Sequence, residues 1–279
     1  MHCLFPHQWK HSTAADSPVA IYTSIRGNMK SIWANTYSTT QQFSGLLPTF
    51  AKPDSDMMDT EEMIDYLNQV VASKVNTAPV SDAYWEGKNV HPLAISAIMA
   101  DQLGEMEIKE KLLAKLKSIM VDWFNYDGPD DRCYLIYNKD WGTVYYPDSA
   151  YGANAAICDH HFTYGYFMFG AAVLATYDKE FLNDYRDMIE LLVRDYADPK
   201  EPEDDGNMFC KFRAFDQYSG HSWAGGYGDS DSGNNQESAS EALFSWVGMY
   251  LWGEATQNEI YIDAGAYGSV SYTHLTLPT

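Results

Sequence analysis

One segment constrains the fold more than any other: HFTYGYFMFGAAVLATY, residues 161–177, which contains no Asp, Glu, Lys or Arg. Wound as an α-helix it is apolar on nearly every side, so other elements must cover it all round. Two further segments, EIKEKLLAKLKSIMVDWF and KEFLNDYRDMIELLVRDY, place apolar residues at helical spacing between charged ones. Buried helices that alternate with amphipathic partners predict a mainly α fold, a helical barrel or toroid with a cleft among its loops.

The other patterns divide the chain into a β-rich start and a helical remainder. Residues 1–50 are rich in Thr, Ser, Ile and Tyr and predict extended structure, with a hairpin turn at Gly27–Asn28. The prolines and the Asp and Ser residues of 48–59 predict a linker. Further helices are expected from Asp59 or Thr60 to about Ser73, from Pro92 as a first-turn residue to about Leu103, and from about Gln236 and about Asn258 onward; YLIYNKDWGTVYYP predicts a β-hairpin, and residues 197–233 predict loop.

Charge and composition exclude several classes of protein. The chain has 39 acidic and 18 basic residues, a net charge of −21, and therefore lacks the basic surface that a nucleic-acid backbone requires. It has no run of about 18 apolar residues, so we expect no membrane span. Its four scattered cysteines show no CxxC spacing, which argues against zinc.

Aromatic residues stand in polar, glycine-containing loops such as KDWGTVYYPDSAYGAN and GHSWAGGYG. A flat ring stacks on the C–H face of a sugar while neighbouring Asp, Asn, Gln and His side chains bind its hydroxyls. Ordinary anchoring of a loop explains any single aromatic residue equally well. The loops therefore indicate a carbohydrate ligand only in combination with other residues.

The segment GNNQESASEA, residues 233–242, places Glu237 and Glu241 four residues apart. With Asn234 or Asn235 as the N-cap, both glutamates would share one helix face, with Cβ atoms about 5–6 Å apart. A solvated acidic first turn, favoured by the helix dipole, explains this pair. Repulsion between two like charges, and the small residues between them, fit a ligand site as well. The local sequence leaves both interpretations open.

Asp159 directly precedes the apolar helix in ICDHHFTYGYF. It is placed to cap that helix, and its aromatic neighbours would equally raise the pKa of its carboxyl and suit it to general-acid catalysis. His160 and His161 are adjacent and point in different directions, so they do not form a chelating pair. DSDSGNNQE departs from a calcium-binding EF-hand at the required Gly and Glu positions. We therefore expect no metal.

These stretches resemble blocks of a known family. CDHHFTYGYF, FDQYSGHSWAGG and above all GNNQESASEA are similar to glycoside hydrolase family 81, the endo-β-1,3-glucanases or laminarinases. YWEGKNV, LFPHQWK, IRGNMK and GLLP also resemble the family, in its order. The resemblance implies a mainly α chain: residues 1–55 would be the end of an N-terminal β-sandwich and connecting region, and residues 56–269 an incomplete (α/α)6 catalytic barrel.

The resemblance also implies roles for individual residues. Asp159 matches the general acid, Glu237 the general base and Glu241 a second essential carboxylate of an inverting hydrolase, in which acid and base stand about 6.5–9.5 Å apart around a water. Thr163 stands where the family often has a histidine, which puts one subsite contact in doubt. Substrate-binding positions would be Tyr84, Lys88, His161, Asp216, His221, Trp223 and Asn235. The implied partner is β-1,3-glucan, the implied location is extracellular or in the cell wall, and no cofactor is needed.

The two ends of the sequence support two further predictions. The start lacks the basic and apolar regions of a signal peptide and falls inside a family block, so we expect a longer natural protein. The last ten residues, VSYTHLTLPT, resemble the translation of a transposase adapter used in sequencing-library preparation. We expect residues 270–279 to be an artefact of that kind.

Two other functions remain compatible with the sequence. Another (α/α)-barrel enzyme, such as a polysaccharide lyase, would need basic residues for the uronic acids of its substrate, whereas the expected cleft is acidic. A glucan-binding fragment without catalysis is the third interpretation. The oligomeric state cannot be read from the sequence.

Overall fold

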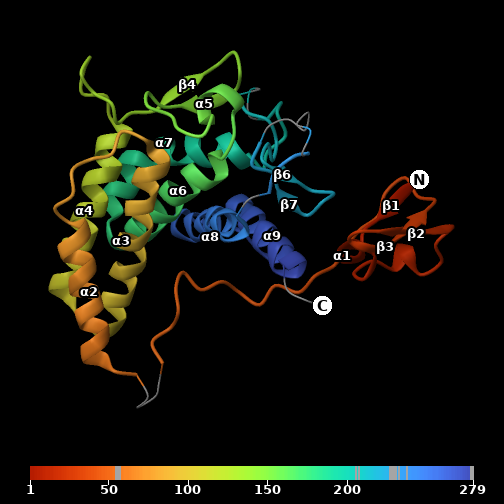
Figure 1. The fold of residues 1–279 in the computed structure, drawn as a ribbon, viewed down its shortest axis with the longest axis horizontal. Coiled ribbons are helices and arrows are strands. Elements are labelled where there is room, and N and C mark those ends of the chain that lie inside the picture. Colours follow the sequence, from red (N-terminus) through yellow and green to blue (C-terminus); the bar gives the residue numbers. More distant parts are fainter. Residues whose placement is uncertain are drawn as a thin grey trace.

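The structure is a computed structural model that describes residues 1–53, 58–204, 206, 208–225, 231, 233–236 and 238–276. The chain is mainly helical, as expected, with a small β-sheet at the N-terminus that an extended segment joins to the helices (Figure 1). Among the described residues, no helix combines the length and apolarity that a membrane crossing needs.

The N-terminal sheet is antiparallel, with strand order β1-β3-β2. Its small core consists of Leu4, Ala15 and Ile32. The hairpin turn falls at residues 25–26, two positions before the expected Gly27–Asn28, and Gly27 instead opens the returning strand at φ 98°, a conformation that suits glycine. The elements are β1 (His2–Leu4), α1 (Pro6–Trp9), the 3-10 helix η1 (Thr13–Ala15), β2 (Ala20–Ser24) and β3 (Gly27–Ile32).

Long helices form most of the remaining chain, and short strands and one short helix lie in the loops between them. The expected hairpin is present as β4 and β5, and the segment between α7 and α8 contains two strands of only two residues each. The elements are α2 (Thr60–Lys74), α3 (Ala83–Leu103), α4 (Met106–Phe124), β4 (Ile136–Asn138), β5 (Thr143–Tyr145), α5 (Ala153–Ala156), α6 (His160–Tyr177), α7 (Lys179–Ala197), β6 (Phe215–Asp216), β7 (His221–Ser222), α8 (Ala239–Thr256) and α9 (Glu259–Thr276).

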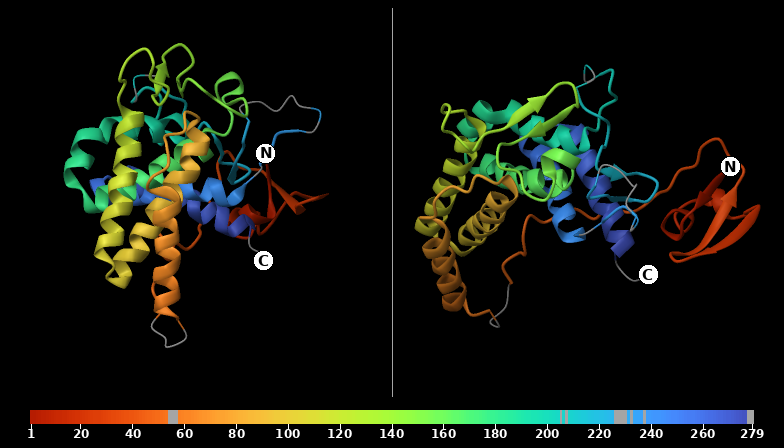
Figure 2. Two further views of the ribbon diagram at one scale, coloured as in Figure 1. Left: turned by 60° about the vertical axis from the view of Figure 1, so that its left-hand side comes forward. Right: turned by 45° about the horizontal axis from the view of Figure 1, so that its top comes forward.

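The apolar segment is α6, and it lies inside the helical assembly as predicted (Figures 1 and 2). It packs against α3, α7 and α8, and α8 packs in turn against α9. Glycines bring α6 and α8 close together: a Cβ on Gly165 would lie 2.7 Å from the Ser245 Cβ, and one on Gly248 would lie 2.8 Å from the Phe169 backbone nitrogen. The interface therefore has no room for larger side chains at these positions.

The start of α3 differs from the prediction. The helix begins at Ala83, where the Asp82 carboxylate caps it by accepting from the Trp85 N–H at 2.9 Å, and Pro92 lies in its interior. The expectation that Pro92 opens the helix is therefore wrong. An interior proline costs about 3 kcal/mol, and here the burial of Val90 and its neighbours between adjacent helices offsets that cost.

The start of α8 also differs. Ser238 is the N-cap, with its hydroxyl accepting from the Glu241 N–H at 3.3 Å, so the expected cap at Asn234 or Asn235 is wrong. The asparagines serve the preceding loop instead, where the Asn235 carbonyl accepts from the Ala224 N–H at 2.7 Å. The helix consequently begins later than its sequence suggests.

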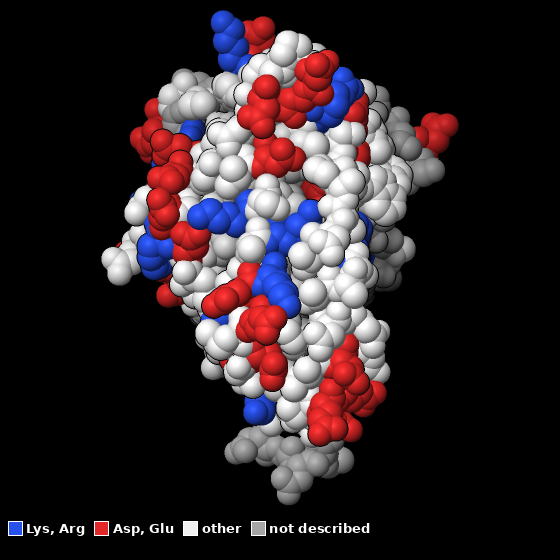
Figure 3. All heavy atoms as spheres, turned by 90° about the vertical axis from the view of Figure 1, so that its left-hand side faces the viewer, with Lys and Arg blue, Asp and Glu red and all other residues white. Residues whose placement is uncertain are grey.

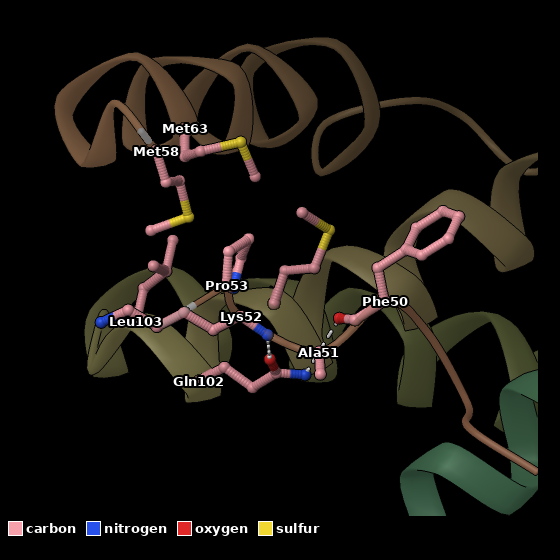
Figure 4. Close-up of a pocket in the computed structure, with 9 residues that line it drawn as sticks. Phe50, Ala51, Lys52, Pro53, Met58, Met63, Gln102 and Leu103 are labelled. Carbon is pink, nitrogen blue, oxygen red and sulfur yellow. Dashed lines mark hydrogen bonds between the residues drawn. The ribbon is translucent and has the colours of Figure 1, made fainter. Parts of the chain in front are cut away.

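The surface reflects the acidic composition. On the face formed by α2, α3 and α4, acidic side chains are widely spread and basic ones gather near the centre (Figure 3). A cavity of about 230 Å³ opens between the linker, the start of α2 and the end of α3. Figure 4 shows Met58 and Met63 above Pro53 and Leu103, with the Gln102 amide bound to the linker backbone. The described residues that line this cavity are mostly apolar.

Candidate active site

Three helices bring three polar side chains together around one carboxylate. Glu241 lies in the first turn of α8, Tyr84 and Lys88 lie one turn apart on α3, and Tyr166 lies on α6. The Glu241 Oε1 atom accepts from the Lys88 Nζ at 2.5 Å, from the Tyr166 hydroxyl at 2.7 Å and from the Tyr84 hydroxyl at 3.0 Å. The structure thus assembles three of the predicted site residues, Tyr84, Lys88 and Glu241, and adds Tyr166.

These contacts keep Glu241 ionised. Burial alone would raise the pKa of its carboxyl, but hydrogen bonds, first from Lys88 and next from Tyr166, outweigh burial and lower the pKa from 4.5 to about 2. Burial would lower the pKa of Lys88, and its bonds to Glu241 and Tyr166 instead raise it. Glu241 is therefore a fixed negative charge, suited to orient water or a neighbouring acid and unsuited to donate a proton near neutral pH.

Aromatic rings extend from this cluster to the surface. The Tyr84 ring lies 5.5 Å from Trp85 and 5.6 Å from Tyr151, and the latter two rings are 6.4 Å apart. Trp85 is 48% exposed and Tyr151 61% exposed, whereas the polar cluster that they border is partly buried. Exposed rings beside a polar cluster offer the flat apolar surface on which a sugar ring stacks.

Asp159 occupies an unusual backbone conformation directly before α6. It is the N-cap residue of α6, as the sequence allowed, but at φ 59° and without the side-chain cap bond expected of it. Its N–H donates to the Ala224 carbonyl at 2.8 Å, which ties it to the β6–β7 segment. Ile157 is left-handed as well, at φ 50°. Left-handed non-glycine residues cost about 1–3 kcal/mol each and concentrate at functional sites.

A second group of predicted residues surrounds the β6–β7 turn. The Asp216 carboxylate accepts from the Trp223 indole N–H at 3.1 Å and from backbone N–H groups of the turn. The rings of His221 and Trp223 lie 4.4 Å apart, and the His221 Nε2 lies 3.0 Å from the Arg26 Nη2 of the N-terminal sheet. Asp216, His221 and Trp223 thus form one unit, and Arg26 joins it from a distant part of the sequence.

The remaining three predicted residues are His161, Asn235 and Glu237. His161 is 1% exposed, its ring packs on Phe162, and burial lowers its pKa to about 3, so it is a neutral core residue. Asn235 is exposed, in the loop before α8. Glu237, the expected general base, lies outside the described residues.

Tyr166 was not predicted as a site residue, whereas Trp85 in YWEGKNV and Tyr151 in KDWGTVYYPDSAYGAN belong to stretches that the sequence associates with carbohydrate binding. A signal for Tyr166 existed: a hydroxyl in an otherwise apolar, fully buried helix needs a partner. The left-handed backbone of Tyr151, at φ 52°, is a property of the folded loop and could not be read from the sequence. Among the described residues, no three His, Cys, Asp or Glu side chains are grouped to hold a metal.

Comparisons with known proteins identify the family of the chain. Residues 56–268 match the glycosyl hydrolase family 81 C-terminal domain, and the chain belongs to this family. It is 36% identical over 267 residues to a glucan endo-1,3-beta-D-glucosidase of Acetivibrio thermocellus, and 34% identical over 266 residues to one of Thermobifida fusca. Each match covers 95% of this chain and 34% of the relative, so the chain spans about a third of these proteins' length.

A solved structure gives the same assignment. The glycoside hydrolase family 81 protein of Clostridium thermocellum, solved as a glutamate-to-alanine mutant, superposes with a TM-score of 0.90 at 34% identity. The match covers 98% of this chain and 38% of that one. The resemblance inferred from sequence motifs is therefore confirmed at the level of the family and of the mainly helical fold.

Proposed function

We propose that this chain is part of an endo-acting β-1,3-glucan hydrolase that works by an inverting acid–base mechanism. The observation that carries the proposal is the Glu241 carboxylate, ionised by Lys88 and two tyrosine hydroxyls beside exposed aromatic rings, in a family 81 chain. The names of the two bacterial relatives supply the substrate class.

In the proposed mechanism Asp159 protonates the glycosidic oxygen and Glu237 activates the attacking water. Glu241 stays anionic, orients that water or raises the pKa of a neighbouring carboxyl, and is held in position by Lys88. The exposed rings of Trp85 and Tyr151 would stack on a glucose unit of the bound chain. The residues around β6–β7 would bind the chain further along, and no step needs a cofactor.

The finer structural assignments belong to the same proposal. Residues 1–55 would be the end of a β-rich connecting region, residues 56–269 part of an (α/α)6 barrel, and residues 270–279 foreign to the natural protein. The expected place of action is outside the cell or in its wall, where such glucans occur.

The test is hydrolysis of laminarin, followed by reducing-end release and by the anomeric form of the first products in proton NMR. We expect α-anomeric oligosaccharides, and loss of activity in Asp159→Asn and in Glu237→Gln. Binding of laminarin without cleavage would refute catalysis and favour a glucan-binding fragment. Unsaturated products would show lyase chemistry, and β-anomeric products would exclude inversion.

A further inference from the structure

The segment that leads to Asp159 is strained and therefore needs support. Tyr151, Ile157 and Asp159 all have left-handed backbones, and Ile157 is β-branched, the type of residue that tolerates this conformation least. Such a turn persists only where the surrounding structure over-determines it. The direction of the Asp159 carboxyl depends on this turn, because the left-handed backbone at φ 59° sets the direction in which its side chain leaves the chain.

The buried side chain of His160 and the partly buried side chain of Arg213 bind the backbone of this segment. The His160 Nε2 lies 3.0 Å from the Ala153 carbonyl oxygen, and the Arg213 Nη1 donates to the Ile157 carbonyl oxygen at 3.3 Å. His160 is 1% exposed and follows Asp159 directly, whereas Arg213 reaches the segment from the loop before β6. Together they hold the strained segment at both ends.

A single buried carboxylate aligns both of these side chains. The Asp195 Oδ2 atom lies 2.7 Å from the His160 Nδ1 and accepts from the Arg213 Nη2 at 2.6 Å. Its Oδ1 accepts from the Thr143 hydroxyl at 2.8 Å and from the Val144 N–H at 2.7 Å. Asp195 is completely buried, and each of its carboxylate oxygens has two hydrogen-bond partners.

We propose that Asp195, His160 and Arg213 are positioning residues that fix the turn at 157–159 and thereby aim the Asp159 carboxyl at the glycosidic oxygen. The inference rests on the proposed function, in which Asp159 is the general acid. Asp195 contributes through His160 and Arg213 and does not touch substrate.

Stability alone is a weak explanation for this cluster. A buried ion cluster is often no more stabilising than well-packed apolar residues of similar volume. Here the donors that the carboxylate orients reach carbonyls of the strained segment, and Arg213 also donates to the Asp195 backbone carbonyl at 2.9 Å. A planar guanidinium spans these acceptors at once, which a lysine ammonium cannot do.

The experiment compares Arg213→Lys and Asp195→Asn with a matched control, Tyr196→Phe. Tyr196 neighbours Asp195 on α7, is equally buried, and donates from its hydroxyl to the Ser245 carbonyl at 3.2 Å, away from the strained segment. Two substrates are used: laminarihexaose, whose leaving group must be protonated, and a 2,4-dinitrophenyl β-laminarioligoside, whose leaving group departs without an acid. Thermal melts accompany every variant.

For both cluster variants we expect kcat on laminarihexaose to fall about 10–100-fold with KM changed less than about twofold, since a displacement near 1 Å costs about that much. On the dinitrophenyl glycoside the loss should stay below about threefold. Tyr196→Phe should lower the melting temperature while keeping kcat on both substrates.

The contrary outcomes distinguish failure of the positioning role from failure of the proposed function. Equal losses on the two substrates, no loss on either, or failure of both cluster variants to fold would overturn the positioning role and leave a structural one. If the unsubstituted chain cleaves neither substrate, the proposed function itself fails, and the inference falls with it. Should Asp195→Asn alone fail to fold, Arg213→Lys decides the question.

Discussion

Replacing Lys88 by methionine tests whether Lys88 keeps Glu241 ionised. The lowering of the Glu241 pKa from 4.5 to about 2 corresponds to about 3 kcal/mol in favour of the carboxylate. Lys88 is the largest lowering contribution, but its side chain is 37% exposed, so solvent screens part of the interaction. We therefore expect Lys88→Met to reduce the free energy of unfolding by about 1–2 kcal/mol at pH 7. For a chain of this size that lowers the melting temperature by about 3–6 °C.

The destabilisation caused by Lys88→Met should depend on pH. A carboxyl with a depressed folded-state pKa contributes stability above its unfolded pKa, near 4.5, and loses it as pH falls toward 2. The destabilisation by Lys88→Met should therefore be full at pH 7 and shrink below about pH 4.5. Thermal melts followed by circular dichroism at pH 7, 4 and 3 measure it.

A matched control and a double-mutant cycle complete the experiment. Lys111→Met breaks an exposed pair with Glu107 on α4 and should change the free energy of unfolding by at most about 0.5 kcal/mol. Combining Lys88→Met with Glu241→Gln should cost less than the sum of the single changes. A loss that is the same at pH 7 and pH 3, or strict additivity in the cycle, would refute the ionic interaction.

Three further results are expected. Trp85→Ala should raise KM for laminarihexaose several-fold with a smaller change in kcat, whereas Tyr126→Ala, which removes an exposed ring elsewhere, should leave both unchanged; equal KM values would exclude stacking. Gly248→Leu should lower the free energy of unfolding by about 1–3 kcal/mol in urea, because its side chain would overlap the backbone of Phe169, and unaltered stability would contradict the close packing. His161, neutral at a pKa of about 3, favours the folded state as pH rises from 3 toward its ordinary value of 6.5, by about 1.4 kcal/mol per pH unit; His161→Phe should flatten the stability–pH curve there, and an unchanged slope would contradict its burial as the neutral form.

The sequence predicted those features that depend on local pattern. The apolar segment became the central helix α6, because apolar residues on all sides leave no other stable place. Asp59 caps α2 as expected, since its short carboxylate precedes a clear helical period. The prediction that Pro92 opens α3 was wrong because burial on α3 outweighs the penalty of an interior proline. The prediction that Asn234 or Asn235 caps α8 was wrong because the Asn235 backbone pairs with Ala224 in the preceding loop.

The cluster around Glu241 was predictable in three of its residues and not in its supporting contacts. Tyr84, Lys88 and Glu241 were identified from motifs, and the structure brings them together. Asp195 was overlooked as one more charge on an amphipathic helix. Its position is nevertheless informative, because an acidic side chain in the last turn of a helix interacts unfavourably with the helix dipole. Such a residue is therefore expected to have a specific partner.

The ion pair at the centre of the site joins residues 153 positions apart in the sequence. The chain pays the loop-closure entropy of that separation before Lys88 and Glu241 meet, so the pair forms only after α3, α6 and α8 have docked. Local helices form much earlier, on the microsecond scale of helix–coil relaxation. During refolding, helical content should therefore return well before the proposed glucan cleavage, which requires this long-range pair to have formed.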